Sequence, residues 1–487
     1  MVKTKAKIKF TSRPPVVSIL GHIDHGKTTL LDNIRKSKLA SAEAGGITQD
    51  IGAYQIEYKG RKITFIDTPG HAAFAKMRAR GAEVTDLAIL VIAADEGVKP
   101  QTRESLKFIQ QAQIPFIVAA NKIDLPASSI EKVSQDLAKE GILVEKKGGE
   151  VVLVPVSAKT GEGVEDLLEM ILLITDMQDI KSDPEAQFKG IIIESKLERL
   201  RGPLATILVK EGTLSITDFI WTEGACAKVK AMYDETGQRV TKAFPSKPVS
   251  VLGFDSVPPV GATVIRVAGK IKSPQLPRQK IAQSTEKTEE EEHKKVKLVL
   301  KADTQGTLEA IRMNLSSEVE LIHQGVGDIN EGDIFLTQTA GASLVGFSVR
   351  IPPRIKKLAS VEKVPIKIYK IIYELLKDID RKVLKILEPT IDEEILGEAE
   401  VIKEFLINDK KIAGCRVLKG RIVRGDQLHL RRNEKILDGC RVNSLHKGKS
   451  EVEKAVANDV FGMGFSPQLD FTVGDVLVSF RKLPQKE

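Results

Sequence analysis

Eight consecutive residues near the start of the chain have the types and spacing needed to hold phosphate groups. They match G-x-x-x-x-G-K-[ST] and are Gly21, His22, Ile23, Asp24, His25, Gly26, Lys27 and Thr28. The glycines let backbone N–H groups approach phosphates, Lys27 adds a positive charge at the β and γ phosphates, and the Thr28 hydroxyl can ligate Mg²⁺. The motif follows an apolar run and precedes a helical pattern, which is the context it requires. The sequence therefore predicts a nucleotide-binding loop.

A second motif closes the next apolar run. It consists of Asp67, Thr68, Pro69 and Gly70. An Asp at the end of a strand can hold Mg²⁺ through water, and the Gly70 N–H can meet a γ phosphate. A simple Asp-Pro-Gly turn is the alternative interpretation of this segment.

Two further loops have the residues needed to recognise a base. The first is Asn121, Lys122, Ile123 and Asp124, and the second, which would form another wall for the base, is Ser157, Ala158 and Lys159. The Asp124 carboxylate can accept two N–H bonds from guanine N1 and its 2-amino group, a donor pair that adenine lacks, so the pattern selects GTP over ATP. Either segment alone could be an ordinary loop. Four motifs in this order, each after a strand, predict a GTP site at the carboxyl ends of a sheet.

The elements that must position these loops lie in residues 13–179, where short apolar runs alternate with helical patterns. The runs are residues 16–20, 63–66, 87–93, 116–120 and 151–156. Nearly continuous apolar runs are typical of parallel strands covered on both faces. We expect βαβ units and a multidomain α/β protein that begins with a P-loop domain.

The rest of the chain can be divided by its pattern of apolar runs and turn residues. Short strand-like runs punctuated by Gly, Pro and Asp predict a β-barrel over 186–272, with strands near 190–194, 205–209, 219–221, 227–232, 249–253 and 263–267. A basic tail at 1–12 precedes the first domain. The segments after the barrel are a linker at 273–295, a small αβα domain at 296–362, a connecting helix at 366–387 and a terminal β-barrel at 391–487.

The predicted connecting helix carries an apolar stripe at steps of three and four. Its members are Ile368, Ile372, Leu375, Ile379, Val383 and Ile386. This spacing places them on one helix face, and 22 residues would span roughly 33 Å. An ordinary packed helix and a mechanical element are both compatible with this pattern. Pro389 ends the helix.

Composition excludes several classes of protein. Of 487 residues, 42% are hydrophobic and 29% are charged, which indicates folded domains rather than disorder. No apolar run reaches the roughly 18 residues of a membrane span, and three cysteines exclude a disulfide scaffold. We expect a cytoplasmic protein that contacts no membrane.

Charge is distributed unevenly. Residues 13–179 carry 20 basic and 23 acidic side chains, whereas the other residues carry 54 and 43. A basic excess outside the first domain fits a polyanionic partner such as RNA, and a merely soluble basic protein is the alternative.

These motifs resemble those of the translational GTPases, and more closely those of the bacterial translation initiation factor 2 family. In the first domain the resemblance rests on residues 13–17, 43–49, 51–54, 67–74 and 77–81. In the later domains it rests on residues 201–203, 211–214, 299–307, 345–350, 412–415 and 474–476. It implies a GTPase domain, a β-barrel, a small αβα domain, a long connecting helix and a terminal β-barrel.

The resemblance also implies roles for single residues. Thr48 would ligate Mg²⁺ in the GTP state together with Thr28 and Asp67, the last through water. His71 would orient the attacking water, and Ile23 and Ile47 would form an apolar gate around it. Without the resemblance, His71 could be an exposed histidine in a turn.

The implied function is a monomeric, ribosome-stimulated GTPase that hydrolyses GTP, binds initiator tRNA and rRNA, and joins the large and small ribosomal subunits. Another GTPase associated with tRNA or ribosomes, and a GTP-gated ribosome-binding scaffold, are the alternatives. Only a short basic tail precedes Arg13, so we expect a short form that lacks the family's N-terminal extension.

The terminal domain departs from the family pattern. Val460, Phe461 and Gly462 stand where the family usually has Glu-Cys-Gly, and the basic loop contains His446, Lys447, Gly448 and Lys449. The family's initiator tRNA site implies contacts from Cys415, His446, Lys447, Lys449, Phe461 and Gly462. Cys415 could equally be a small buried hydrophobe and Phe461 a core residue.

Overall fold

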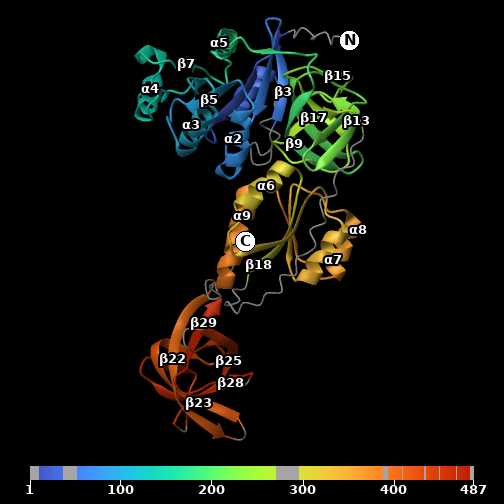
Figure 1. The fold of residues 1–487 in the computed structure, drawn as a ribbon. Coiled ribbons are helices and arrows are strands. Elements are labelled where there is room, and N and C mark those ends of the chain that lie inside the picture. The colour runs from blue at the N-terminus through green and yellow to red at the C-terminus, as the bar shows by residue number, and fades with distance from the viewer. Residues whose placement is uncertain are drawn as a thin grey trace. The chain divides into compact units, whose positions relative to one another are not determined.

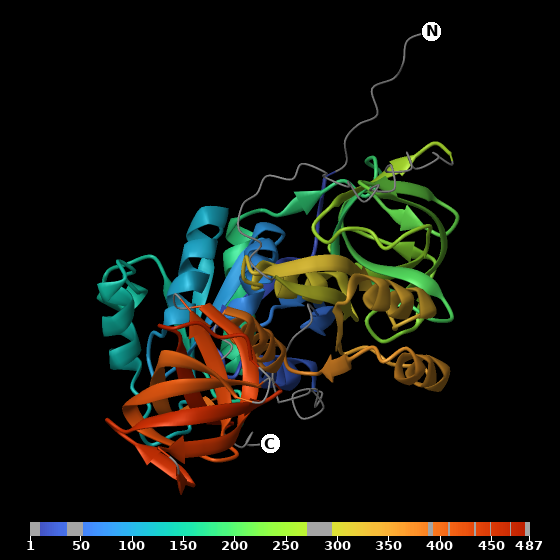
Figure 2. The same cartoon turned by 90° about the horizontal axis from the view of Figure 1, so that it is seen from below.

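The computed structural model divides the chain into two compact units, residues 1–380 and residues 381–487, which are described separately (Figures 1 and 2). The structure describes residues 10–36, 52–269, 295–387, 393–407, 410–432, 435–448, 450–467 and 469–482. None of the helices in these ranges is both long and apolar enough to cross a membrane.

The first domain is built on a six-stranded sheet. Its order is β3 (Gly52–Tyr58), β4 (Arg61–Asp67), β2 (Val16–Gly21), β5 (Leu87–Ala93), β6 (Phe116–Asn121) and β7 (Val152–Pro155). β3 runs antiparallel to β4, and the other neighbours are parallel. The five apolar runs identified in the sequence correspond to β2, β4, β5, β6 and β7.

Helices cover both faces of this sheet. They are α1 (Lys27–Arg35), α2 (Ala75–Glu83), α3 (Pro100–Ala112), α4 (Ile130–Lys139) and α5 (Val164–Met177), with short 3-10 turns η2 (Ala72–Phe74) and η3 (Glu145–Lys147). Apolar residues of α1 and α5 form one core with the sheet, and those of α3 and α4 form another on alternate strand positions. Because both faces are buried, the strands must be apolar throughout, which explains the runs in the sequence.

The second domain is a barrel. Its main strands are β9 (Lys189–Glu198), β10 (Gly202–Glu211), β12 (Phe219–Thr222), β13 (Ala225–Tyr233), β16 (Pro248–Phe254) and β17 (Thr263–Val267). They follow the order β12-β17-β9-β10-β16-β13, and pairing of β12 with β13 closes the barrel. All six strands expected from the sequence are present.

Polar contacts attach this barrel to the first domain. The Arg13 guanidinium donates to both carboxylate oxygens of Asp86, at 2.7 and 2.6 Å, and to Ser246 Oγ at 3.0 Å. Thr64 Oγ1 donates to the Ser246 carbonyl oxygen at 2.6 Å, and Lys210 Nζ donates to the Val84 carbonyl oxygen at 2.5 Å. Hydrogen bonds from Arg13, Thr64 and Lys210 therefore join the barrel to the first domain, and two of these three donors are charged.

The third domain is a small α/β unit with a parallel sheet. Its order is β19 (Val319–Val326), β18 (Val296–Ala302), β20 (Ser343–Phe347) and β21 (Ile366–Tyr369), and its helices are α6 (Gln305–Met313), α7 (Glu331–Ala340) and α8 (Pro353–Val361). α6 contacts β18 and β19, whereas α7 contacts β18 and β20.

The predicted connecting helix is shorter than expected. Residues 366–369 form edge strand β21 paired with β20, and helix α9 runs over Ile372–Leu387. The expectation of one helix over 366–387 was therefore wrong at its start. Ile368 belongs to the strand, where its periodicity coincides by chance with the helical stripe. Ile372, Leu375, Ile379 and Val383 are buried on one face as predicted.

Residues 381–487 contain a second barrel. Its long strands are β22 (Glu393–Ile407), β23 (Lys410–Val423), β24 (Gln427–Arg432), β25 (Lys435–Lys447), β28 (Val460–Ser466) and β29 (Val476–Lys482). The order is β22-β29-β24-β25-β28-β23, and β22 pairs with β23 to close it.

Candidate nucleotide-binding site

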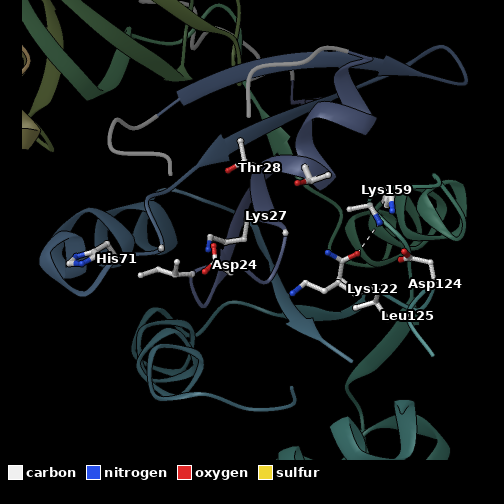
Figure 3. Close-up of a pocket in the computed structure, with 14 residues that line it drawn as sticks. Asp24, Lys27, Thr28, His71, Lys122, Asp124, Leu125 and Lys159 are labelled. Atoms are coloured by element: carbon white, nitrogen blue, oxygen red, sulfur yellow. Dashed lines mark hydrogen bonds between the residues drawn. The ribbon is translucent and has the colours of Figure 1, made fainter. Parts of the chain in front are cut away.

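A pocket of about 400 Å³ lies where the strands of the first domain end (Figure 3). It brings together residues from all four predicted motifs. Its lining residues are Ile23, Asp24, Gly26, Lys27, Thr28, Thr29, Gly70, His71, Asn121, Lys122, Asp124, Leu125, Ala158 and Lys159. The topology produces this arrangement because the loops after β2, β4, β6 and β7 share one sheet edge.

The backbone of the phosphate-binding loop requires two of its glycines. Gly21 has φ +148°, and a Cβ there would lie 2.4 Å from the Val91 carbonyl oxygen. Gly26 has φ +83°, caps the N-terminus of α1, and would place a Cβ 2.3 Å from Asn121 Nδ2. The loop therefore leads directly into a helix N-terminus, where free N–H groups favour an anion.

Lys27 is a buried cation beside the second motif. Its side chain donates to the His22 carbonyl oxygen at 2.6 Å, and a Cβ added to Gly70 would lie 2.4 Å from Nζ. Burial lowers the pKa of Lys27 to about 8, and the nearby Asp67 carboxylate opposes that shift. A polyphosphate in the pocket would favour the charged ammonium, because an adjacent negative charge stabilises it.

Asn121 joins the two halves of the pocket. Its Nδ2 donates to the His25 carbonyl oxygen at 2.8 Å, and its Oδ1 accepts from the Ala158 N–H at 2.8 Å. Next to it, Ser157 Oγ donates to Asp124 Oδ1 at 2.7 Å and orients that carboxylate. The base-recognition residues predicted from the sequence therefore form one connected group.

The two histidines of the loop have structural contacts. His25 is fully buried, and its Nδ1 lies 3.3 Å from the Val91 carbonyl oxygen, so an N–H at Nδ1 must be the donor. Burial lowers the pKa of His25 to about 4. The His22 ring contacts the His25 ring edge-on at 5.0 Å, and burial also lowers the pKa of His22. Both rings are therefore neutral at pH 7.

Arg78 supports the loop after β4 and was not identified from the sequence. Its fully buried guanidinium donates to the carbonyl oxygens of Pro69 at 3.1 Å and His71 at 2.5 Å, and to Glu104 at 2.5 Å. Thr68 Oγ1 donates to the Ile19 carbonyl oxygen at 2.9 Å, so this threonine points into the domain. The sequence signal that could have indicated this buried arginine is the position of Arg78 among the small and apolar residues that precede Gly81.

The predicted metal ligands fit Mg²⁺ only in combination with other oxygens. Among the described residues, no group of three His, Cys, Asp or Glu side chains could hold a metal ion by itself. Thr28 lines the pocket, and the Asp67 carboxylate is close enough to Lys27 to shift its pKa. A hydroxyl and one carboxylate suit Mg²⁺, which keeps several waters and binds substrate phosphates. Thr48, and Ile47 of the predicted gate, lie outside the described residues.

The predicted tRNA residues do not form one surface. Cys415 and Phe461 face each other on β23 and β28 and are 0% and 3% exposed, within the barrel core. Burial raises the pKa of Cys415 to about 12, so it is an unreactive thiol. The structure thus contradicts side-chain contacts from these two residues and agrees with the core alternative. Lys447 is exposed, whereas Lys449 lies outside the described residues.

The remaining predicted residues of this group lie together on β25 and β28. His446 is half-buried and pairs with Gly462 in the sheet. Lys447 donates to Asp459 Oδ1 at 2.6 Å. These residues therefore place one imidazole and one ammonium group near the same edge of the barrel.

Three segments of the chain match models of known families. Residues 13–176 match the Elongation factor Tu GTP binding domain, residues 187–267 match Elongation factor G domain 2, and residues 272–380 match Translation-initiation factor 2.

Whole-chain relatives are proteins named Translation initiation factor IF-2. That of Dehalococcoides mccartyi is 41% identical over 97% of this chain and 83% of its own length. That of Petrotoga mobilis is 41% identical over 98% of this chain and 72% of its own, and that of Aquifex aeolicus is 42% identical over 95% and 60%. The chain therefore spans between about three fifths and four fifths of these relatives.

Among solved structures, GDP-bound aIF5B from Aeropyrum pernix is similar, with 25% identity, a TM-score of 0.46, and coverage of 96% of this chain and 92% of that chain.

Burial of His25 predicts a loss of stability in acid. Its pKa is about 4 in the folded state and 6.5 when unfolded, so below pH 6.5 the unfolded state takes up a proton that the folded state does not. At pH 5 this difference destabilises the fold by about 2 kcal/mol relative to pH 8. His25→Asn keeps an N–H donor and should remove this part of the pH dependence.

Amide hydrogen exchange of the β2 and α1 peptides at pH 5 and 8, corrected for intrinsic rates, measures the opening free energy. The unsubstituted protein supplies the control for all other titrating groups. Equal pH dependence in both proteins would contradict the assignment of a neutral, buried His25.

Proposed function

Because the chain belongs to the translation initiation factor IF-2 family, we propose that the pocket around residues 21–28 is where this GTPase binds GTP with Mg²⁺. Hydrolysis of GTP to GDP and phosphate during initiation of protein synthesis is the reaction of the family. One observation carries the assignment of the site: a single pocket contains the buried Lys27 ammonium and the Asp124 carboxylate. These are the charges needed at opposite ends of a guanine nucleotide.

Each group has a distinct task in this proposal. Lys27 and the backbone of the loop bind the phosphates, and Asp124 accepts hydrogen bonds from the guanine base. Thr28, Thr48 and, through water, Asp67 would hold Mg²⁺, which when bound offsets charge on the β and γ phosphates. Since phosphoryl transfer needs little covalent chemistry from protein, catalysis depends on positioning.

We assign His71 the task of orienting the attacking water. Arg78 holds the backbone of this loop through the Pro69 and His71 carbonyls, so it is a positioning residue. Ile23 lines the same pocket and, with Ile47, would form the apolar gate that keeps His71 from water. Stimulation by the ribosome would then consist of bringing the imidazole to the γ phosphate.

Guanine selectivity is tested by Asp124→Asn. Removing two hydrogen bonds to a carboxylate should weaken GTP binding about 100- to 1,000-fold. Xanthosine triphosphate should gain relative affinity, because its C2 carbonyl can accept from an amide. Titration calorimetry with GTP, XTP and ATP measures these affinities, and Asp166→Asn on the exposed side of α5 is the matched control. Equal affinity of the unsubstituted protein for ATP and GTP would end the proposal of guanine recognition.

Catalysis by His71 is tested by His71→Ala. GTP affinity should be kept, and turnover stimulated by ribosomes should fall by about 100-fold or more. Release of phosphate with and without ribosomes measures this effect. His323→Ala replaces an exposed histidine of the third domain and is the control. Undiminished ribosome-stimulated turnover in His71→Ala would assign the reaction to another group.

We further propose that the factor acts as a cytoplasmic monomer, binds initiator tRNA and rRNA, and promotes joining of the large and small ribosomal subunits. The excess of positive charge outside residues 13–179 supports a polyanionic partner. Of the predicted tRNA residues whose side chains the structure describes, Lys447 is exposed and His446 is half-buried, so both are available for tRNA. Light scattering during subunit joining, with and without formyl-methionyl-tRNA and with GTP against GDP, tests this role.

The tRNA contact predicts an effect of Lys447→Ala on salt dependence. Loss of one phosphate contact to a single strand should reduce the slope of log K against log salt by about 0.7. Filter binding of formyl-methionyl-tRNA at several salt concentrations measures the slope. Lys454→Ala, an exposed lysine on another strand of the same barrel, is the control. The same slope in both variants and the unsubstituted protein would exclude Lys447 from the contact.

A further inference from the structure

The imidazole of His71 is engaged away from the phosphate-binding loop. Its Nδ1 accepts a hydrogen bond from the Ala73 N–H at 3.1 Å and thereby caps η2. Figure 3 shows the ring pointing away from Lys27 and Thr28. In this position the Ala73 N–H occupies Nδ1, so this nitrogen cannot accept a hydrogen bond from a water molecule.

An aromatic side chain from a distant part of the chain contacts this ring. Tyr373, in the first turn of α9, stacks on His71 with ring centroids 6.0 Å apart and an angle of 21° between planes. Phe74 contacts the same imidazole edge-on at 6.3 Å. Both separations are within the range for favourable aromatic pairs.

Tyr373 is not needed to hold α9 in place. The buried face of the helix is formed by Ile372, Leu375 and Ile379, which are at most 1% exposed. The Tyr373 side chain is 48% exposed, although Tyr is a large aromatic residue that gains from burial. Its contact with His71 is therefore separable from the packing of the helix.

Other contacts hold the backbone of this segment to the third domain. Asn314 Nδ2 donates to the Ala73 carbonyl oxygen at 3.1 Å, and Glu309 pairs with Lys76 and with Arg80. None of these contacts involves the imidazole itself. Tyr373 therefore contacts the His71 side chain. The third-domain residues Asn314 and Glu309 contact other groups of this segment, namely the Ala73 carbonyl and the Lys76 and Arg80 side chains.

We propose that Tyr373 is a positioning residue that keeps the His71 imidazole turned away from Lys27 and Thr28, at the margin of the pocket that His71 helps to line. This inference rests on the proposed catalytic role of His71. Burial and the nearby Arg78 guanidinium lower the pKa of His71, which keeps Nδ1 free to accept from Ala73. For hydrolysis the ring must leave both Ala73 and Tyr373, so the stacking contact lowers the population of the productive rotamer.

The test is GTP hydrolysis without ribosomes in Tyr373→Leu. Loss of one aromatic pair should raise the single-turnover rate about two- to twelvefold with GTP affinity unchanged. Tyr373→Phe keeps the ring and should keep the slow rate. Phe335→Leu is the matched control, because Phe335 is also an aromatic residue of the third domain with 48% exposure, on α7. Tyr373→Met provides a second unstacked variant should the leucine variant fold poorly.

A spectroscopic measurement separates this role from a general loosening of the structure. The ring-current shift of the His71 imidazole, identified by its absence in His71→Ala, should change in Tyr373→Leu and persist in Tyr373→Phe. An unchanged signal, or an unchanged or lower rate in Tyr373→Leu, would overturn the proposal.

The double variant distinguishes the two hypotheses. In a His71→Ala background, Tyr373→Leu should give no increase in rate, because the imidazole on which Tyr373 acts is gone. An increase there would refute action through His71. If His71→Ala alone retains full ribosome-stimulated turnover, the proposed role of His71 fails. If His71→Ala lowers ribosome-stimulated turnover but Tyr373→Leu leaves the rate without ribosomes unchanged, only the proposed role of Tyr373 is rejected.

Discussion

The pair of hydrogen bonds made by Asn121 is the contact on which the nucleotide site depends. One joins the end of β6 to the loop after β2, and the other joins it to the loop after β7. The side chain is 1% exposed, so a lost partner would leave a buried polar atom at a cost of about 1–3 kcal/mol. The absence of a side chain at Gly26 allows the Asn121 amide to reach this loop, because a Cβ at Gly26 would occupy the space of that amide. The phosphate and base regions are thus held at a constant separation before a nucleotide arrives.

Two buried cations set the electrostatics on the other side of the pocket. Arg78 pairs with Glu104 and donates to two backbone carbonyls, so its charge serves to shape the loop. Lys27 has the Asp67 carboxylate nearby, yet burial still lowers its pKa. A cation held in this way gains more from a phosphate than a solvated lysine would, because its desolvation has already occurred during folding. Arg78 is engaged by protein groups and stabilises the loop, whereas Lys27 lines the pocket and is placed to contact a ligand.

The sequence located the four motifs whose residues the structure brings together in one pocket. The loop at 21–28 and the three other motifs could be identified because their backbone and side chains act within a few residues of a strand end. Contacts between distant segments could not be found this way, as Arg78 and Tyr373 show. Edge strands were missed for a related reason: β3 is half exposed and lacks an apolar run. In the terminal barrel, the family resemblance implied that Cys415 contacts initiator tRNA. The pairing of β23 with β28, which the sequence does not reveal, places Cys415 opposite Phe461 in the core.

Helix α6 contacts both the barrel and the first domain, and these contacts differ in burial. Glu194 of β9 is 8% exposed and accepts the Gly306 N–H at 3.1 Å, so the barrel caps the N-terminus of α6 with a buried carboxylate. The two ion pairs of Glu309 differ in exposure, because the Lys76 side chain is 46% exposed whereas the Arg80 side chain is 19% exposed. Solvent-exposed ion pairs contribute about 0–1 kcal/mol each. Helix α2, which follows the loop after β4, is held to α6 by these pairs and by the buried Met77, because a Cβ at Gly306 would lie 2.6 Å from Met77 Cε. A Cβ at Gly306 would also lie 2.7 Å from Glu194 Oε2, so the N-terminus of α6 is the place where buried groups of the barrel and of the first domain both contact the third domain.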